Sequence, residues 1–351
     1  MNHTVCHPEL GSGSIINNLK KEMQSNNTEF YLIKEMLEVP ELIRNFDAAK
    51  TQKLSDLIFK HKNLFLTGEG SSRLFPAKNF IDQKLKQNKD LVVYTQGSRQ
   101  ASEYDLLDFI VFGASNSGKT KEIISAFDKL KNKGHKNLLG LTATPNSPLE
   151  NYCNETYVLN CGKENAVAAT KSVVEQGLFY QSILQGTEWQ NKNKCADLVE
   201  QTLTQNIDPQ IIDTIANAET IYFAGRNNGV TEELALKTNE IVRKKSVYLD
   251  GTFVLHGIEE IMTEKDIVII IEPFEEEMET YKKRLQDGVG LNVIAINSKD
   301  TIFPTIQIPE LENFNSYIQL AAGWNVLVEV GLKLNINLDK PKRARKVGNS
   351  F

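Results

Sequence analysis

The sequence predicts an α/β protein with two parallel β-sheets, each doubly wound and flanked by helices. Its 351 residues exceed the usual size of one domain, so two domains are favoured. Short apolar runs recur along the chain without strict alternation, which is typical of strands buried on both faces of a parallel sheet. Segments of helical periodicity follow these runs, and regular strand–helix alternation is characteristic of doubly wound sheets.

The apolar runs form two similar series. In the first half, the expected strands are residues 64–67, 91–94, 109–112, 138–141 and 157–159. In the second half, they are residues 221–224, 246–249, 267–271, 293–296 and 306–308. Helical periodicity is clearest in residues 30–43, 119–133 and 232–245. In such open sheets ligands bind at the carboxyl ends of the strands, so functional residues are expected in the loops that follow them.

The two series predict the domain organisation. We expect a helical segment over residues 1–45, a first α/β domain over 46–190 and a second over 191–335. A polar, amide-rich segment at residues 185–194 marks the boundary between the two domains. Residues 336–351 lack apolar periodicity, and we expect an irregular tail there.

The composition is that of an ordinary globular protein, with 40% hydrophobic and 24% charged residues and a net charge of −5. Apart from a basic run at 340–346, nothing suggests a nucleic-acid partner. No apolar run approaches the roughly 20 residues of a membrane span, and the N-terminus lacks a signal core, so we expect no membrane partner and a cytoplasmic location. The four cysteines are Cys6, Cys153, Cys161 and Cys195, and none has CxxC spacing. We expect them to be reduced thiols without a disulfide framework, as is usual in the cytosol.

A phosphate-binding loop is predicted after the third strand. Residues 113–120 read Gly-Ala-Ser-Asn-Ser-Gly-Lys-Thr and stand between an expected strand and an expected helix. Ser115, Ser117 and Thr120 supply hydroxyl donors, and the helix adds free N–H groups and the positive end of its dipole. This combination would bind a phosphate monoester without a metal ion.

The same residues also fit the nucleotide-binding pattern GxxxxGK[ST], in which Lys119 would contact phosphates. A nucleotide-hydrolysing site needs an acidic residue at the end of another strand to hold magnesium. Here the next strand ends in Thr142-Ala143-Thr144 instead. Nucleotide binding and an ordinary helix N-cap remain alternatives for this segment.

From this loop outward, the sequence resembles the sugar isomerase (SIS) domain family, and most of all the isomerase half of glucosamine-6-phosphate synthase. The resemblance covers nearly the whole chain and implies two tandem SIS domains with a sugar phosphate as ligand. Similar segments occur in order at residues 35–40, 70–72, 101–104, 115–120, 164–171, 233–240, 255–257 and 339–346.

The resemblance also implies which residues bind the ligand. The phosphate and sugar contacts would come from Ser71, Ser72, Ser115, Asn116, Ser117, Thr120, Val167 and Ala169. Glu233 and Lys237 would complete the binding set. They are four residues apart, and Glu240 follows three residues later, so all three side chains share one face of a helix. Ala169 stands where the synthase has serine, so one hydroxyl contact is lost and the sugar specificity is expected to differ. Lys119 stands where the synthase has an acidic residue.

Three residues are the catalytic candidates that the resemblance implies. Glu240 would move a proton between C1 and C2, a task suited to a carboxylate in a partly dry pocket. His256, which follows Glu240 by 16 residues as in the family, would open the sugar ring from the neighbouring subunit of a homodimer with shared active sites. Lys346 would approach the open carbonyl, although a solvated basic tail is the alternative. We expect no cofactor, and no metal because no ligand cluster has suitable spacing.

The expected activity is isomerisation or deamination of an amino-sugar (hexosamine) 6-phosphate through a 1,2-enediol or enediolamine. The sequence starts at the isomerase part, without the glutaminase domain of the synthase, so we expect no use of glutamine as the ammonia source. Two alternatives stay open. One is a deglycase of fructosamine-6-phosphate adducts, and the other is a regulator that binds a sugar phosphate without turnover.

Overall fold

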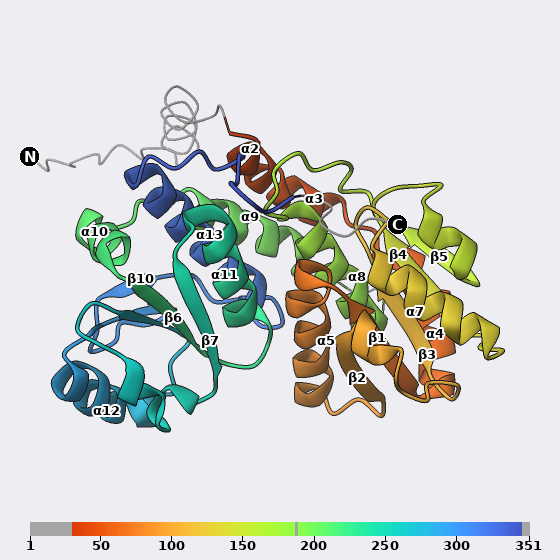
Figure 1. The fold of residues 1–351 in the computed structure, drawn as a ribbon, viewed down its shortest axis with the longest axis horizontal. Coiled ribbons are helices and arrows are strands. Elements are labelled where there is room, and N and C mark those ends of the chain that lie inside the picture. The colour runs from red at the N-terminus through yellow and green to blue at the C-terminus, as the bar shows by residue number, and fades with distance from the viewer. Residues whose placement is uncertain (1–29, 187–188, 346–351) are drawn as a thin grey trace, which may run out of the picture.

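The computed structural model describes residues 30–186 and 189–345. It contains two five-stranded sheets that lie side by side, each with helices packed against it (Figure 1). The first sheet consists of β1 (Asn63–Gly68), β2 (Val92–Gly97), β3 (Ile110–Ala114), β4 (Leu138–Thr142) and β5 (Glu155–Val158). The second consists of β6 (Thr220–Gly225), β7 (Lys245–Asp250), β8 (Ile267–Ile271), β9 (Asn292–Asn297) and β10 (Thr305–Gln307). Each expected strand is present, and the α/β fold class with two parallel sheets is confirmed.

The two sheets share one topology. The strand order is β2-β1-β3-β4-β5 in the first sheet and, read from the other edge, β7-β6-β8-β9-β10 in the second. All neighbouring strands pair in parallel. The chain direction across the sheet reverses between β1 and β3 and again between β6 and β8. Such switch points are where open α/β sheets bind ligands.

Helices join the strands and precede the first sheet. Those of the first half are α2 (Tyr31–Leu37), α3 (Val39–Asn45), α4 (Gln52–His61), α5 (Leu74–Lys86), α6 (Ser98–Ala101), α7 (Lys121–Asn132) and α8 (Lys171–Gln185). Those of the second half are α9 (Lys192–Leu203), α10 (Pro209–Asn217), α11 (Val230–Lys237), α12 (Met278–Tyr281) and α13 (Asn315–Lys333). No helix of the described residues is both long enough and apolar enough to cross a membrane.

The strands divide their side chains between two apolar layers, as expected for sheets covered on both faces. Ile267, Ile269 and Ile271 of β8 belong to the large cluster that also contains α8 and α13. Val268 and Ile270 belong to a separate cluster beneath α12. Because the large cluster includes residues of both sheets, the two halves share one continuous core.

Two predicted helices differ from the structure. The periodic segment 30–43 forms α2 and α3 instead of one helix, since Pro40 lacks an N–H group and its ring crowds the preceding turn. The segment 232–245 ends early: α11 passes into a π-helical turn, η4 (Thr238–Val242), which stops at Arg243 with a φ of 59°. Residues 336–345 contain no helix or strand, as predicted for the tail, whereas residues 1–29 lie outside the described chain.

The second half contacts the first closely at the start of α11. Gly229 has a φ of +88°, and a Cβ placed there would lie 2.6 Å from the backbone oxygen of Leu74 and 2.7 Å from the Cα of Phe75. Both atoms belong to the backbone at the start of α5, which cannot move aside as a flexible side chain would. Glycine is therefore required by backbone conformation and by space.

Gly229→Ala is expected to lower the free energy of unfolding by about 3 kcal/mol or more. The left-handed backbone costs a residue with a Cβ about 1–2 kcal/mol, and overpacking adds about 1–3 kcal/mol. Gly134→Ala is the matched control, since Gly134 has a φ of +84° but nothing within 4 Å of the added Cβ. Urea denaturation followed by circular dichroism measures the free energy of unfolding of both variants. An equal decrease in this free energy in the two variants would contradict the close contact between α11 and α5.

Candidate active site

A cleft of about 620 Å³ lies at the carboxyl ends of β1 and β3, the switch point of the first sheet. Its walls come from the loops after these strands, from the segment between β5 and α8, and from α11 with η4. The predicted site residues that line it are Ser71, Ser72, Asn116, Ser117, Thr120, Val167, Ala169, Lys237 and Glu240. The structure therefore brings most of the predicted ligand-binding set together with the candidate base.

The phosphate loop is held in a tight turn between β3 and α7. The Ser115 hydroxyl lies 2.7 Å from the Thr120 hydroxyl, and Ser115 is buried behind the loop instead of lining the cleft. Gly118 has a φ of +61°, and a Cβ there would lie 2.1 Å from Ser147 Oγ. The loop thus presents Ser117 and Thr120 to the cleft next to the N-terminus of α7, a favourable place for an anion.

Lys119 is exposed and does not line the cleft. A nucleotide-binding loop directs this lysine at the phosphates. No group of three or more His, Cys, Asp or Glu in the described part of the chain could hold a metal ion. These placements give no support to the nucleotide alternative.

Lys237 lies at the base of the cleft and is fully buried. Its Nζ donates to Ser71 Oγ at 2.7 Å and to Glu240 Oε2 at 2.8 Å, and it lies 3.2 Å from Glu233 Oε1. The three partners match the three donors of an ammonium group. Because Ser71 follows β1 and the carboxylates follow β6, this interaction joins the two halves of the chain.

The electrostatics of this cluster favour a charged lysine. Burial opposes the charged form of Lys237, but Glu233 and Glu240 outweigh it and raise the pKa of Lys237 above its ordinary value. Burial also raises the pKa of Glu233, although Lys237 acts in the opposite direction. The Glu240 side chain keeps 21% of its surface exposed, so this carboxylate is accessible from the cleft. Glu233 instead is completely enclosed, behind Lys237.

One predicted catalytic residue, His256, does not line the cleft. His256 is exposed at the end of a short 3-10 turn, η5 (Phe253–Leu255), where its Nε2 lies 3.4 Å from Thr252 Oγ1. It does not line the cleft of its own chain, so any role there requires a second copy of the protein. Lys346 lies outside the described residues, although its neighbour Arg345 lines the cleft.

Several cleft residues were not predicted from the sequence. They are Glu69, Glu122, Thr144, Gly162, Lys163, Glu164, Ser172 and Arg345. Glu69 follows directly after β1 and Thr144 lies two residues after the end of β4, so their position at strand ends was a usable signal. Glu164 belongs to the segment that resembles the SIS family, but nothing in the sequence showed where its carboxylate points.

Comparison with known proteins identifies the class of fold. Residues 57–185 match the family model of the SIS domain, so this part of the chain is a SIS domain. The resemblance to the SIS family predicted from the sequence is thereby confirmed for this part of the chain. The match spans the first sheet through α8, and the second sheet repeats its strand order.

Solved structures share the fold over most of the chain. The C-terminal domain of glucosamine-fructose-6-phosphate aminotransferase from Francisella tularensis is 18% identical with a TM-score of 0.72, covering 90% of this chain and 99% of that one. Tagatose-6-phosphate ketose/aldose isomerase from Escherichia coli is 16% identical with a TM-score of 0.74, covering 91% and 97%. Glucosamine-6-phosphate deaminase from Thermotoga maritima is 17% identical with a TM-score of 0.66, covering 90% and 98%. A sequence search of curated proteins found no match.

Lys237→Met is expected to lower the free energy of unfolding by about 3–5 kcal/mol, because it leaves the Glu233 carboxyl group buried without its cation. The double variant Glu233→Gln/Lys237→Met should recover a large part of this loss. Lys333→Met is the control, since Lys333 pairs with Asp213 at the surface and such pairs contribute at most about 1 kcal/mol. Chemical denaturation measures the free energy of unfolding of all three variants. A Lys237→Met protein as stable as the Lys333→Met control would refute the pairing of Lys237 with Glu233.

Proposed function

We propose that the protein is an isomerase or deaminase of an amino-sugar 6-phosphate. One observation carries the proposal: buried Lys237 holds the candidate base Glu240 beside Ser71, within the cleft that the phosphate loop also lines. An acid–base group and an anion-binding loop thus face the same ligand space. The SIS domain match supports a sugar ligand, and the neighbours in fold include an aminotransferase, an isomerase and a deaminase of sugar phosphates by name.

In this proposal the phosphate group binds to the hydroxyls of Ser71, Ser72, Ser117 and Thr120 and to the N-terminus of α7. Glu240 removes a proton from C1 or C2 of the open-chain sugar and returns it to the neighbouring carbon. Lys237 remains charged, orients the Glu240 carboxylate and stabilises the negative charge that develops on the enediol oxygen. In the deaminating direction the nitrogen-bearing carbon becomes an imine, which water hydrolyses to a ketone and ammonia.

Ring opening needs a group that gives a proton to the ring oxygen and takes one from the anomeric hydroxyl, and we assign this to His256. Since His256 is exposed and absent from its own cleft, the proposal requires a homodimer in which each chain completes the site of the other. Lys346 is proposed to approach the open carbonyl from the tail. We also propose that the second half of the chain is a second SIS domain, because its sheet has the same strand order.

Glu240→Gln is expected to lower kcat by roughly 10²–10⁴-fold while leaving the affinity for the sugar phosphate nearly unchanged, since only the proton-transfer group is lost. The assay follows ammonia or amine release and ketose formation from glucosamine 6-phosphate and from fructosamine-6-phosphate adducts. Glu219→Gln is the control, because the Glu219 side chain is 65% exposed and does not line the cleft. Calorimetric titration with the same compounds gives the affinities.

The substrate panel also separates the alternatives. Preferred release of an amine from the fructosamine-6-phosphate adducts would identify a deglycase. Tight binding of a sugar phosphate with no turnover by the unmodified protein would identify a regulator and contradict the proposed enzyme.

A mixture of Glu240→Gln chains and His256→Ala chains is expected to regain activity after subunit exchange. In a shared-site dimer, half of the sites of a mixed dimer contain both an intact Glu240 and an intact His256. The activity of the mixture is compared with that of each variant alone, and size-exclusion chromatography with light scattering confirms that mixed dimers form. Mixed dimers without activity would exclude the shared site.

A further inference from the structure

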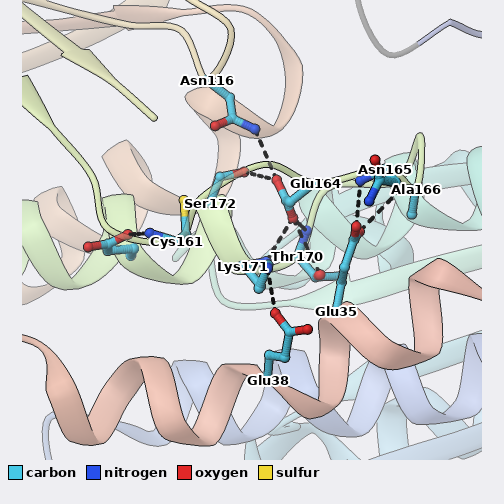
Figure 2. Close-up of polar contacts among 11 residues, drawn as sticks. Glu35, Glu38, Asn116, Cys161, Glu164, Asn165, Ala166, Thr170, Lys171 and Ser172 are labelled. Atoms are coloured by element: carbon cyan, nitrogen blue, oxygen red, sulfur yellow. Dashed lines mark hydrogen bonds and ion pairs between the residues drawn. The ribbon is translucent and has the colours of Figure 1, made fainter. Parts of the chain in front are cut away.

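The segment 159–170, between β5 and α8, has no helix or strand but is held by three buried carboxylates (Figure 2). Glu35, Glu164 and Glu175 are only 4%, 3% and 2% exposed. Each accepts two consecutive backbone N–H groups of this part of the chain. The donor pairs are Asn160 and Cys161 for Glu175, Asn165 and Ala166 for Glu35, and Thr170 and Lys171 for Glu164.

Glu164 differs from the other two because it also contacts the loop after β3, which forms another wall of the cleft. Its Oε1 accepts the N–H groups of Thr170 and Lys171 at 2.7 and 2.9 Å. Its Oε2 accepts Asn116 Nδ2 at 3.0 Å and the hydroxyl of Ser172. Figure 2 shows Asn116 and the segment before α8 converging on this one carboxylate. The Thr170 hydroxyl adds a longer contact of 3.5 Å to Oε1. All five groups can donate, which suits a carboxylate that accepts hydrogen bonds at both oxygens.

The contact with Asn116 has a defined direction. A carboxylate accepts hydrogen bonds, so the amide nitrogen of Asn116 must face Glu164 and the amide oxygen must point elsewhere. Asn116 belongs to the phosphate loop, and its backbone carbonyl is held separately by the N–H of Ala143 at 3.1 Å. Glu164 thus fixes the side chain of Asn116, while Ala143 fixes its backbone.

We propose that Glu164 is a positioning residue of the sugar-phosphate site, which holds the phosphate loop and the segment 159–170 in the mutual geometry that binds the ligand. The inference rests on the proposed function, because it assumes that a sugar phosphate occupies the cleft. It assigns to Glu164 no contact with the reacting atoms. A preorganised wall avoids the loss of affinity that ordering a loop on binding would bring.

The test compares Glu164→Gln with Glu175→Gln. Both variants remove one buried charge that holds two N–H groups of the same segment, but only Glu164 is linked to the phosphate loop. We expect similar decreases in melting temperature, and a roughly tenfold to hundredfold weaker affinity for glucosamine 6-phosphate in Glu164→Gln alone. KM should rise with little change in kcat. If Glu164→Gln does not fold, Glu164→Asp and Glu175→Asp take their places, since the shorter side chain cannot span both walls.

A reciprocal exchange tests the link itself. Asn116→Asp alone places two carboxylates in contact and should destabilise the protein, whereas Asn116→Asp/Glu164→Gln restores a donor and an acceptor in reversed order and should regain stability. The inference is overturned if Glu164→Gln binds like the unmodified protein, if Glu175→Gln loses as much affinity, or if the double variant is no more stable than Asn116→Asp. Failure of the unmodified protein to bind any sugar phosphate would instead reject the proposed function.

Discussion

The geometry of the cleft depends on one buried ammonium group. Taking the charge of Lys237 out of water is costly unless partners replace its hydration, and Glu233, Glu240 and Ser71 do so. Because these partners come from both halves of the chain, the requirement to neutralise one buried charge sets how α11 lies against the loop after β1. The candidate base Glu240 is thereby held beside the loops after β1 and β3 that line the cleft.

The repeated topology places different loops at the two switch points, and the cleft at the first sheet has walls from both halves of the chain. Hydroxyl-bearing loops follow β1 and β3, where the first sheet reverses direction. At the equivalent switch point of the second sheet, β8 is followed by Glu272, Pro273 and Phe274, and Arg226 stacks on the Phe274 ring at 3.9 Å. The loop after β8 therefore carries a carboxylate and an aromatic ring where the loops after β1 and β3 carry hydroxyls. The second half contributes instead the side chains of α11 and η4, which close the cleft of the first.

Buried carboxylates also replace regular secondary structure in the wall before α8. A segment without a helix or strand leaves backbone N–H groups unpaired, and burying such groups is unfavourable. Glu35, Glu164 and Glu175 each accept two such groups, which lets this irregular segment form a wall of the cleft. Glu35 comes from α2, so the helices before the first sheet are part of the support of the cleft (Figure 1).

The sequence by itself determined the two sheets, since strands buried on both faces appear as continuous apolar runs wherever they occur, as residues 267–271 do. It also predicted a phosphate-binding loop at residues 113–120, because hydroxyl spacing before a helix is a local pattern. The tertiary structure alone decided which polar side chains meet. Ser71 and Lys237 are 166 residues apart and Asn116 and Glu164 are 48 apart, and no local periodicity encodes such pairs. Packing likewise turned Ser115 behind its loop, because a hydroxyl satisfied by Thr120 can be buried. The direction of a polar side chain depends on partners that are distant in the sequence, whereas the burial of an apolar strand can be predicted from the residues of that strand alone.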